Sequence, residues 1–217
     1  YNNPTYTYPN LNSQEQITFS NLGHPMLPDN VRVCNDVTFI DQKFIILTGS
    51  NMSGKSTFLR SLGINMVLAN TGAPVCATAA NIHPLDIYVS MRLSDSLSDN
   101  ESYFFAEVKR LKEVMDTADS KLTFILLDEI LRGTNSDDKR QGTVEVIKKL
   151  ISKRVIGAIA THDLKVCDTT SDYPTQLINK NFEVEIREGE LLFDYKLRDG
   201  VCKNKSATYI MKKMKII

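Results

Sequence analysis

Residues 49–57 read GSNMSGKST in a chain of 217 residues. This stretch fits the pattern G-x-x-x-x-G-K-[ST] at every fixed position, with the apolar run 44–47 before it and a segment with helical spacing after it. Gly49 and Gly54 allow backbone angles at which several N–H groups converge on one anion, and the helix turns its positive end toward the same point. We therefore predict a strand, a phosphate-binding loop and a helix, rather than a turn that contains two glycines by chance.

The residue types in this loop indicate a nucleotide triphosphate with magnesium. Lys55 would reach the β- and γ-phosphates, and the Ser56 hydroxyl would ligate a Mg²⁺ ion that bridges them. The predicted nucleotide-binding residues are Gly49, Ser50, Asn51, Met52, Ser53, Gly54, Lys55, Ser56 and Thr57.

A second signal is the apolar run 122–127, LTFILL, which ends in Asp128-Glu129. Such a run is typical of a strand buried inside a parallel sheet, where two carboxylates are costly unless a cation is near. Asp128 would hold Mg²⁺ through water, and Glu129 would polarise the water that attacks the γ-phosphate. The alternative is a strand that ends in surface acids.

A third apolar run, residues 155–160, ends at Thr161-His162. His162 can donate a hydrogen bond to the γ-phosphate or to the attacking water, although a single histidine at a strand end is usually structural. Because the carboxyl ends of parallel strands meet at one edge of a sheet, we expect the three strand ends to share one pocket.

The remaining periodicity predicts an α/β fold: a mostly parallel central sheet flanked by helices, with an antiparallel β edge. Expected strands cover 17–20, 31–39, 43–48, 85–93, 122–127 and 155–160, and a hairpin over 176–197 turns at 187–190. Expected helices cover 55–70, a segment that opens near residue 101, 139–153 and 206–214, whereas 75–84 is expected to be irregular.

Composition is that of one α/β domain with a small appendage. Hydrophobic residues make up 42%, charged residues 24%, and 26 basic residues balance 26 acidic ones, so no strongly basic surface is expected. The apolar runs are only strand-length, which predicts no membrane span. Four scattered cysteines without a C-x-x-C pair indicate reduced thiols in a cytoplasmic protein. The chain starts at Tyr1 with a polar stretch, so we expect it to be cut from something longer.

These motifs together resemble the ATPase domain of the MutS family of DNA mismatch-repair proteins, which belongs to the ABC-type ATPases with a P-loop. Residues 48–57, TGSNMSGKST, are close to the family's TGPNMGGKST, and residues 128–135, DEILRGTN, resemble DELGRGTS. Residues 160–162 match ATH, and residues 101–107, ESYFFAE, resemble STFMxE. The similarity runs from about Ile17 to Ala207.

The resemblance implies an Mg²⁺-dependent ATPase that works as a homodimer through its ATPase faces. Ser102, which by position alone would cap a helix, would face the γ-phosphate of the partner's ATP. Asn51 would help to hold the γ-phosphate or its water, and Asn135 would lie in the loop that crosses the dimer seam. The implied catalytic residues are Glu129, His162, Lys55 and Asn51, with Ser56 and Asp128 at the metal.

The implied organisation has three parts: a linker over 1–16, a P-loop ATPase domain over 17–197 and part of a C-terminal helical dimerisation element over 198–217. DNA would be bound mainly by domains outside this chain, which ATP would switch. Four positions depart from the family pattern without removing a catalytic group, which indicates a divergent branch: Ser50 for Pro, Ser53 for Gly, Leu131 for Gly and Lys139 for Gly.

Three alternatives remain open at this point. In the first, the domain acts in recombination control or another DNA transaction instead of mismatch repair. In the second, it is a nucleotide-gated dimerisation module with little turnover. An ATPase of a transporter or a chromosome-organising protein would carry an L-S-G-G-type signature, and the stretch before Phe104 lacks one.

Overall fold

The computed structural model describes residues 3–91, 103–118, 120–187, 190–203 and 211. Its strands are β1 (Asn10–Leu11), β2 (Ile17–Leu22), β3 (Asn35–Phe39), β4 (Phe44–Gly49), β5 (Ala79–Ile82), β6 (Asp86–Ser90), β7 (Thr123–Asp128), β8 (Val155–Ala160), β9 (Leu177–Phe182), β10 (Glu185–Arg187), β11 (Glu190–Leu192) and β12 (Leu197–Asp199). Its helices are α1 (Lys55–Asn70), α2 (Tyr103–Ala118), α3 (Ser136–Ile151), the 3₁₀ helix η1 (Leu164–Asp168) and α4 (Thr169–Asp172). None of the helices in these ranges is long and apolar enough to cross a bilayer.

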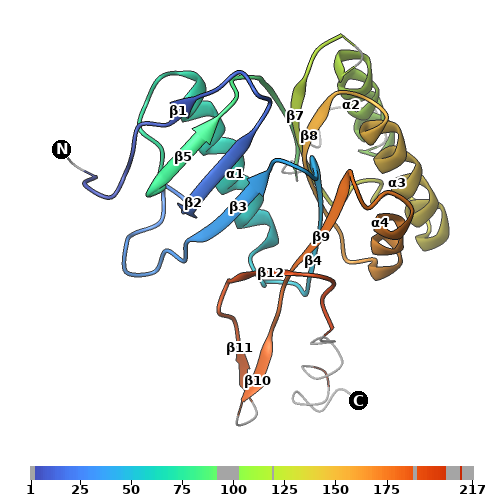
Figure 1. The fold of residues 1–217 in the computed structure, drawn as a ribbon. Coiled ribbons are helices and arrows are strands. Elements are labelled where there is room, and N and C mark those ends of the chain that lie inside the picture. Colours follow the sequence, from blue (N-terminus) through green and yellow to red (C-terminus); the bar gives the residue numbers. More distant parts are fainter. Residues whose placement is uncertain (1–2, 92–102, 119, 188–189, 204–210, 212–217) are drawn as a thin grey trace.

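A six-stranded sheet with the order β12-β9-β4-β8-β7-β6 forms the centre of the molecule (Figure 1). Its neighbouring strands are parallel except for β12, which runs antiparallel to β9 at one edge. Every residue of β4, β7 and β8 is buried, which explains why these strands are continuous apolar runs rather than alternating ones. The predicted α/β class, with a mostly parallel sheet and an antiparallel edge, is therefore confirmed.

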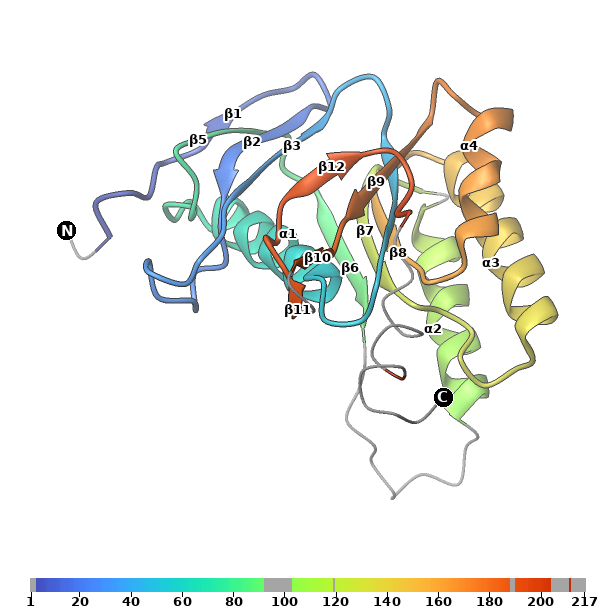
Figure 2. The ribbon, with the colours of Figure 1, turned by 90° about the horizontal axis from the view of Figure 1, so that it is seen from below.

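Helix α1 shares a core with this sheet and with a smaller one of the order β1-β5-β2-β3, and the two sheets also touch directly, since the rings of Phe39 and Phe124 lie 5.7 Å apart edge to face. One core joins the three layers: Ile45 of β4 and Phe124 of β7 share it with Leu59 and Leu62 of α1 and with residues of β2 and β3. Figure 2 shows α1 on one side of the central sheet and α2, α3 and α4 on the other. The central sheet is thus covered by α1 and the small sheet on one face and by α2, α3 and α4 on the other.

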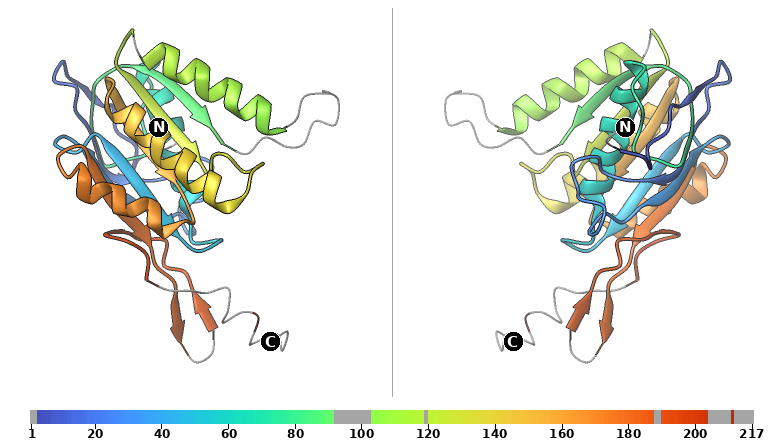
Figure 3. Two further views of the ribbon diagram at one scale, coloured as in Figure 1. Left: turned by 90° about the vertical axis from the view of Figure 1, so that its right-hand side faces the viewer. Right: turned by 90° about the vertical axis from the view of Figure 1, so that its left-hand side faces the viewer.

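The second core lies on the opposite face of the central sheet. Alternate residues of the same strands, Ile46 of β4 and Ile125 of β7, pack there with Leu111 of α2 and Ile147 of α3. Figure 3 shows α2 and α3 side by side over this face, and the antiparallel hairpin of β10 and β11 extending away from the body. Burial on both faces fixes the sheet, and the sheet in turn fixes the positions of its strand ends.

Several predicted boundaries were wrong. The segment 75–84 contains β5, whose small residues lack the alternation that predicts a strand. Strand β3 begins at Asn35 instead of residue 31, β6 ends at Ser90, and α3 begins at Ser136 instead of residue 139. The first strand of the 176–197 segment, β9, is a parallel strand of the central sheet, and only β10 and β11 form the hairpin.

The two ends of the chain were predicted to be a linker and a short helix. Residues 10–11, in the predicted linker, pair with β5 as strand β1. Of the predicted helix 206–214, only Met211 lies within the described residues, and it is helical.

The register of the central sheet brings three strand ends to the same level. Ala160 of β8 lies opposite Leu47 of β4 on one side and Asp128 of β7 on the other. Two backbone hydrogen bonds continue past the strands: Thr161 N–H donates to the Leu47 carbonyl at 3.0 Å, and Glu129 N–H donates to the Ala160 carbonyl at 2.9 Å. The segments after β4, β7 and β8 therefore leave the sheet next to one another.

Candidate functional site

The loop between β4 and α1 has three residues with positive φ: Gly49 at 151°, Met52 at 66° and Gly54 at 108°. A Cβ atom at Gly49 would lie 2.6 Å from Ser53 Oγ and 2.9 Å from the Phe182 carbonyl oxygen, so no other residue fits there. Buried Lys55 folds back over the loop, and its Nζ donates to the carbonyls of Gly49 and Ser50, each at 2.9 Å. The loop is thus wrapped around a lysine ammonium.

Ser56 and Asp128 meet at the side of this loop. Ser56 Oγ donates to Asp128 Oδ2 at 2.7 Å, which links the first turn of α1 to the end of β7. The other carboxylate oxygen, Asp128 Oδ1, is buried and has no hydrogen-bond partner, and the same holds for Ser50 Oγ and Ser53 Oγ. Buried polar atoms without partners are rare in native structures, and several at one place indicate a ligand.

Glu129 lies between His162 and Arg132. Its Oε1 is 2.5 Å from His162 Nε2, and its Oε2 is 3.1 Å from an Arg132 guanidinium nitrogen. The hydrogen bond from His162 is the main reason why the pKa of Glu129 falls from 4.5 to about 2; burial opposes this, while the charges of His162, Arg132 and Lys55 lower the pKa further. Glu129 is therefore ionised at neutral pH, although its side chain is only 14% exposed.

A cavity of about 760 Å³ lies beside these groups, and Lys55, Ser56, Glu129 and His162 are among the residues that line it. Its lining combines polar residues, among them 53–57 with Glu129 and His162, and apolar side chains that include Val31, Phe182 and Tyr195. Its full lining is Leu22, His24, Leu27, Val31, Val33, Asn35, Asn51, Met52, Ser53, Gly54, Lys55, Ser56, Thr57, Phe58, Arg60, Ser61, Glu129, His162, Phe182 and Tyr195. The lining thus offers polar groups to an anion and apolar side chains to a flat group.

The structure brings most of the predicted site residues together here. Asn51 and Met52 line the cavity as exposed residues at the tip of the loop, and Met52 is 82% exposed. Gly49, Ser50, Asp128 and Asn135 are not among the lining residues. The Asn135 side chain instead caps α3 by accepting hydrogen bonds from Asp137 and Asp138 N–H. Ser102 lies outside the described residues.

The donor set suits Mg²⁺ better than a transition metal. Within the described ranges, no group of three or more His, Cys, Asp or Glu side chains gathers at one point. Mg²⁺ is usually bound through one or two carboxylates together with substrate phosphates and water, and it prefers oxygen ligands. The Ser56 hydroxyl and the Asp128 carboxylate, with its unpaired Oδ1, fit that requirement.

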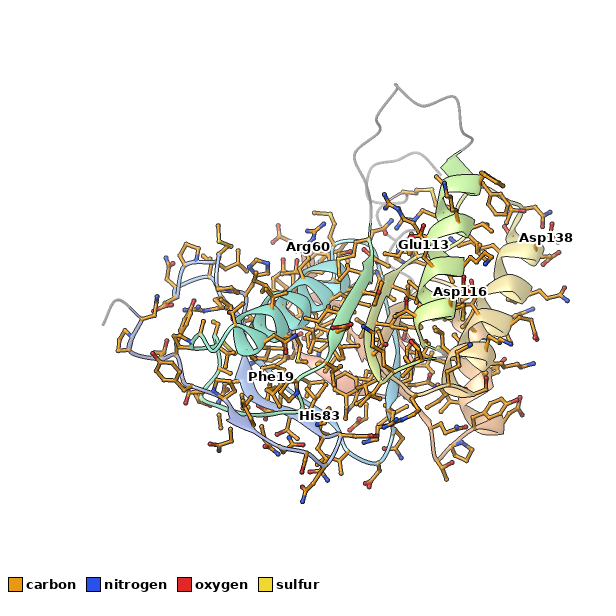
Figure 4. The ribbon with its side chains drawn as sticks, turned by 90° about the horizontal axis from the view of Figure 1, so that it is seen from above. Phe19, Arg60, His83, Glu113, Asp116 and Asp138 are labelled. Atoms are coloured by element: carbon orange, nitrogen blue, oxygen red, sulfur yellow. The ribbon has the colours of Figure 1, made fainter. Side chains whose placement is uncertain are left out.

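Sequence patterns alone missed three residues of the site. Arg132 contacts Glu129. Its position four residues after Asp128 was the feature of the sequence that could have indicated this contact. Arg60 of α1 lines the cavity; together with burial, which is the larger effect, its charge lowers the pKa of His24 at the same wall. Tyr195 reaches the loop from a distant segment, and a Cβ at Gly54 would lie 3.2 Å from its ring. Figure 4 shows Arg60 on α1.

Comparison with known proteins gives a match over most of the chain. The profile of the family described as MutS domain V matches residues 45–216, which contain every predicted site residue from Gly49 to His162.

Individual relatives agree with the profile. The chain is 32% identical over 200 residues to a DNA mismatch repair protein MutS of Thermotoga neapolitana, which covers 90% of the chain. It is 32% identical over 170 residues, 75% of the chain, to the human MutS protein homolog 4, and 29% identical over 209 residues, 91% of the chain, to a MutS of Methanococcoides burtonii. The chain spans 25%, 18% and 23% of the length of these three relatives, respectively.

Proposed function

This chain belongs to the MutS family, and from that premise we propose that it is an ATP-binding and ATP-hydrolysing domain with a P-loop, ABC-type fold. The observation that carries the proposal is the meeting of three strand ends at one cavity. Lys55, Ser56 with Asp128, and Glu129 with His162 all lie at that edge of the sheet. A triphosphate needs a cation, a metal ligand and a water-activating group at one place, and these residues supply all three.

Residues 49–57 would bind the phosphates. Lys55 Nζ now bonds to two loop carbonyls, so its ammonium already lies inside the loop that a phosphate would enter. The buried hydroxyls of Ser50 and Ser53 have no partner, and phosphate oxygens are suitable acceptors for both. The apolar side chains of the lining, among them Phe182 and Tyr195, would hold the base.

Ser56 and Asp128 would hold Mg²⁺ beside the phosphates. A bound Mg²⁺ neutralises charge that develops on the β- and γ-phosphate oxygens. The role of this chain is to present the hydroxyl and the carboxylate from two elements that are already linked by a 2.7 Å hydrogen bond.

Glu129 would take the proton of the attacking water. His162 hydrogen-bonds to Glu129 Oε1 and keeps the carboxylate a weak base, with a pKa of about 2. A γ-phosphate in the cavity would compete for the His162 proton, and loss of that hydrogen bond would make Glu129 more basic. His162 would thus report the γ-phosphate, and Asn51 at the loop tip would help to hold it.

The wider assembly follows from the family. Two copies would close on each other's nucleotides, with Ser102 facing the partner's γ-phosphate and Asn135 at the seam. Residues 17–197 would be the ATPase domain and 198–217 part of a dimerisation element, while segments outside this chain would bind DNA in mismatch repair.

Replacing Glu129 by Gln tests the proposal. The substitution keeps size and hydrogen bonding, so ATP binding should be retained while phosphate release falls about 10²–10⁴-fold, as is typical when a general base is lost. Glu113→Gln, at an exposed carboxylate on α2, is the matched control and should leave turnover unchanged. Unchanged turnover in Glu129→Gln would remove Glu129 from this role, and nucleotide binding without any turnover in the unaltered protein would favour the nucleotide-gated dimerisation module.

A further inference from the structure

The turn that follows β7 is strained where it carries the proposed general base. Glu129 has a φ of 52° and Leu131 a φ of 59°. Both values lie in the left-handed region, which residues other than glycine and asparagine rarely adopt. Such conformations persist only where surrounding contacts hold them. The contacts that hold this turn therefore decide where the Glu129 carboxylate lies.

Arg132 supplies most of these contacts by folding back over the turn. Its Nε donates to the Glu129 carbonyl at 2.8 Å, and its Nη2 donates to the Asp128 carbonyl at 3.3 Å. The same Nη2 lies 3.1 Å from Glu129 Oε2. One guanidinium thus binds two carbonyls of the turn and the carboxylate itself, which only a rigid fork of donors can do at once.

Arg132 is in turn held by α2. Its backbone N–H donates to Glu107 Oε2 at 3.2 Å. The next residue, Gly133, packs so closely on the same helix that a Cβ atom would lie 2.7 Å from Phe104 Cβ. Residues 132 and 133 are therefore attached to the first two turns of α2.

We propose that Arg132 is a positioning residue that couples the position of α2 to that of the Glu129 carboxylate, with Glu107 as the contact on the helix. A movement of α2 shifts the backbone of Arg132, which shifts the guanidinium and with it the strained turn. The inference rests on the proposed function, because α2 begins at the residue after Ser102, which that function assigns to the partner's nucleotide. Contact of α2 with one nucleotide would thereby be transmitted to the catalytic carboxylate of the other site.

Substitutions at Glu107 in the complete protein test the coupling. Glu107→Ala removes the acceptor, and we expect kcat for ATP hydrolysis to fall about 10–100-fold with KM nearly unchanged, because a displaced catalytic group affects turnover more than binding. Glu107→Gln keeps an acceptor oxygen and should recover most of kcat. Glu113→Ala, on the same helix (Figure 4), is the control for loss of an α2 carboxylate and should behave like the unaltered protein.

A double substitution tests whether Glu107 acts through Arg132. Arg132→Gln alone should lower kcat at least as much as Glu107→Ala does. If the two residues act as one unit, Glu107→Ala combined with Arg132→Gln is no slower than Arg132→Gln alone. Losses that multiply would show independent roles and would overturn the coupling.

Hydrogen exchange tests the same link without any catalysis, so its result does not depend on the proposed function. The amides of residues 128–132 should exchange faster in Glu107→Ala than in Glu113→Ala, because the turn loses its attachment to α2. Unchanged exchange there, together with a kcat equal to that of the control, overturns the proposal. If the unaltered protein hydrolyses no ATP, the proposed function fails, while faster exchange would still support the structural link.

Discussion

The chain leaves the sheet after β4 and after β7 through residues with positive φ, but the types of residue that adopt this conformation differ between the two places. After β4 the conformation falls on Gly49, Gly54 and the exposed Met52. After β7 it falls on Glu129 and on Leu131, whose side chain is buried. Glycine adopts such angles at little cost, whereas a residue with a side chain does so only under restraint.

Only one of the two segments is encoded by its own local sequence. The β4 loop is preorganised by its own glycines, so its function can be inferred from the order of nine residues. The β7 turn depends on distant groups: Arg132 closes it, Glu107 of α2 holds Arg132, and Leu131 packs where Gly142 of α3 leaves room. Substitution of its own glycines should therefore disrupt the conformation of the β4 loop. The conformation of the β7 turn should instead be disrupted by substitution of residues far from it in sequence.

The largest expected effect comes from Gly49→Ala. The added Cβ would meet Ser53 Oγ and the Phe182 carbonyl, so the loop must shift, and we expect ATP affinity to fall about 100-fold, or about 2.7 kcal/mol. Gly72→Ala is the control, since Gly72 also has positive φ but has open space around it. Equal ATP affinity in the two variants, measured by titration calorimetry, would mean that the loop is not preorganised by Gly49.

A smaller effect is expected from Leu131→Gly, which installs the family's residue in the β7 turn. Loss of the buried side chain outweighs the relief of strain, so the free energy of unfolding should fall by about 2 kcal/mol. Leu131→Ala should be less stable than Leu131→Gly by about 1 kcal/mol, because alanine keeps the strained φ. Urea unfolding measures both, and the usual order, with alanine more stable than glycine, would show that the turn is unstrained.

Gly142→Ala should lower the free energy of unfolding by about 1 kcal/mol, although the same change inside a helix ordinarily stabilises. The added Cβ would lie 2.5 Å from Leu131 Cδ1, so the Leu131 side chain must move and disturb the turn. In a Leu131→Ala background the clash is gone, and Gly142→Ala should become stabilising. If Gly142→Ala is stabilising in both backgrounds, as measured by urea unfolding, the packing of α3 does not affect the β7 turn.

The smallest effect concerns pH. The pKa of Glu129 is lowered from 4.5 to about 2, so its ionised form stabilises the folded state fully above pH 4.5, and this stabilisation is lost as pH falls toward 2. Between pH 7 and pH 4 the stability difference between the unaltered protein and Glu129→Gln should shrink by about 0.8 kcal/mol. A difference that stays constant over this range in urea titrations would show that His162 and Arg132 do not hold the carboxylate.

Much of the fold could be predicted, and the failures have physical causes. The strands that became β4, β7 and β8 are continuous apolar runs because both faces of the sheet are covered, so they were predicted nearly to the residue. Strand β5 was missed because its pairing with β1 and β2 comes from the small sheet and not from its own pattern. The start of α3 was set too late, although Asn135 followed by Asp137 and Asp138 is a usual helix start.

The sequence by itself determined the class of the fold and which residue types carry the chemistry of the site, because glycine positions and buried apolar runs act over a few neighbouring residues. Only the tertiary structure decided that β4, β8 and β7 lie next to one another, with Leu47, Ala160 and Asp128 in register. It also decided that Arg132 and Glu107 hold Glu129, and that Tyr195 reaches the loop. Those contacts join segments far apart along the chain, and their geometry is set by the packing of whole layers, which no local pattern contains.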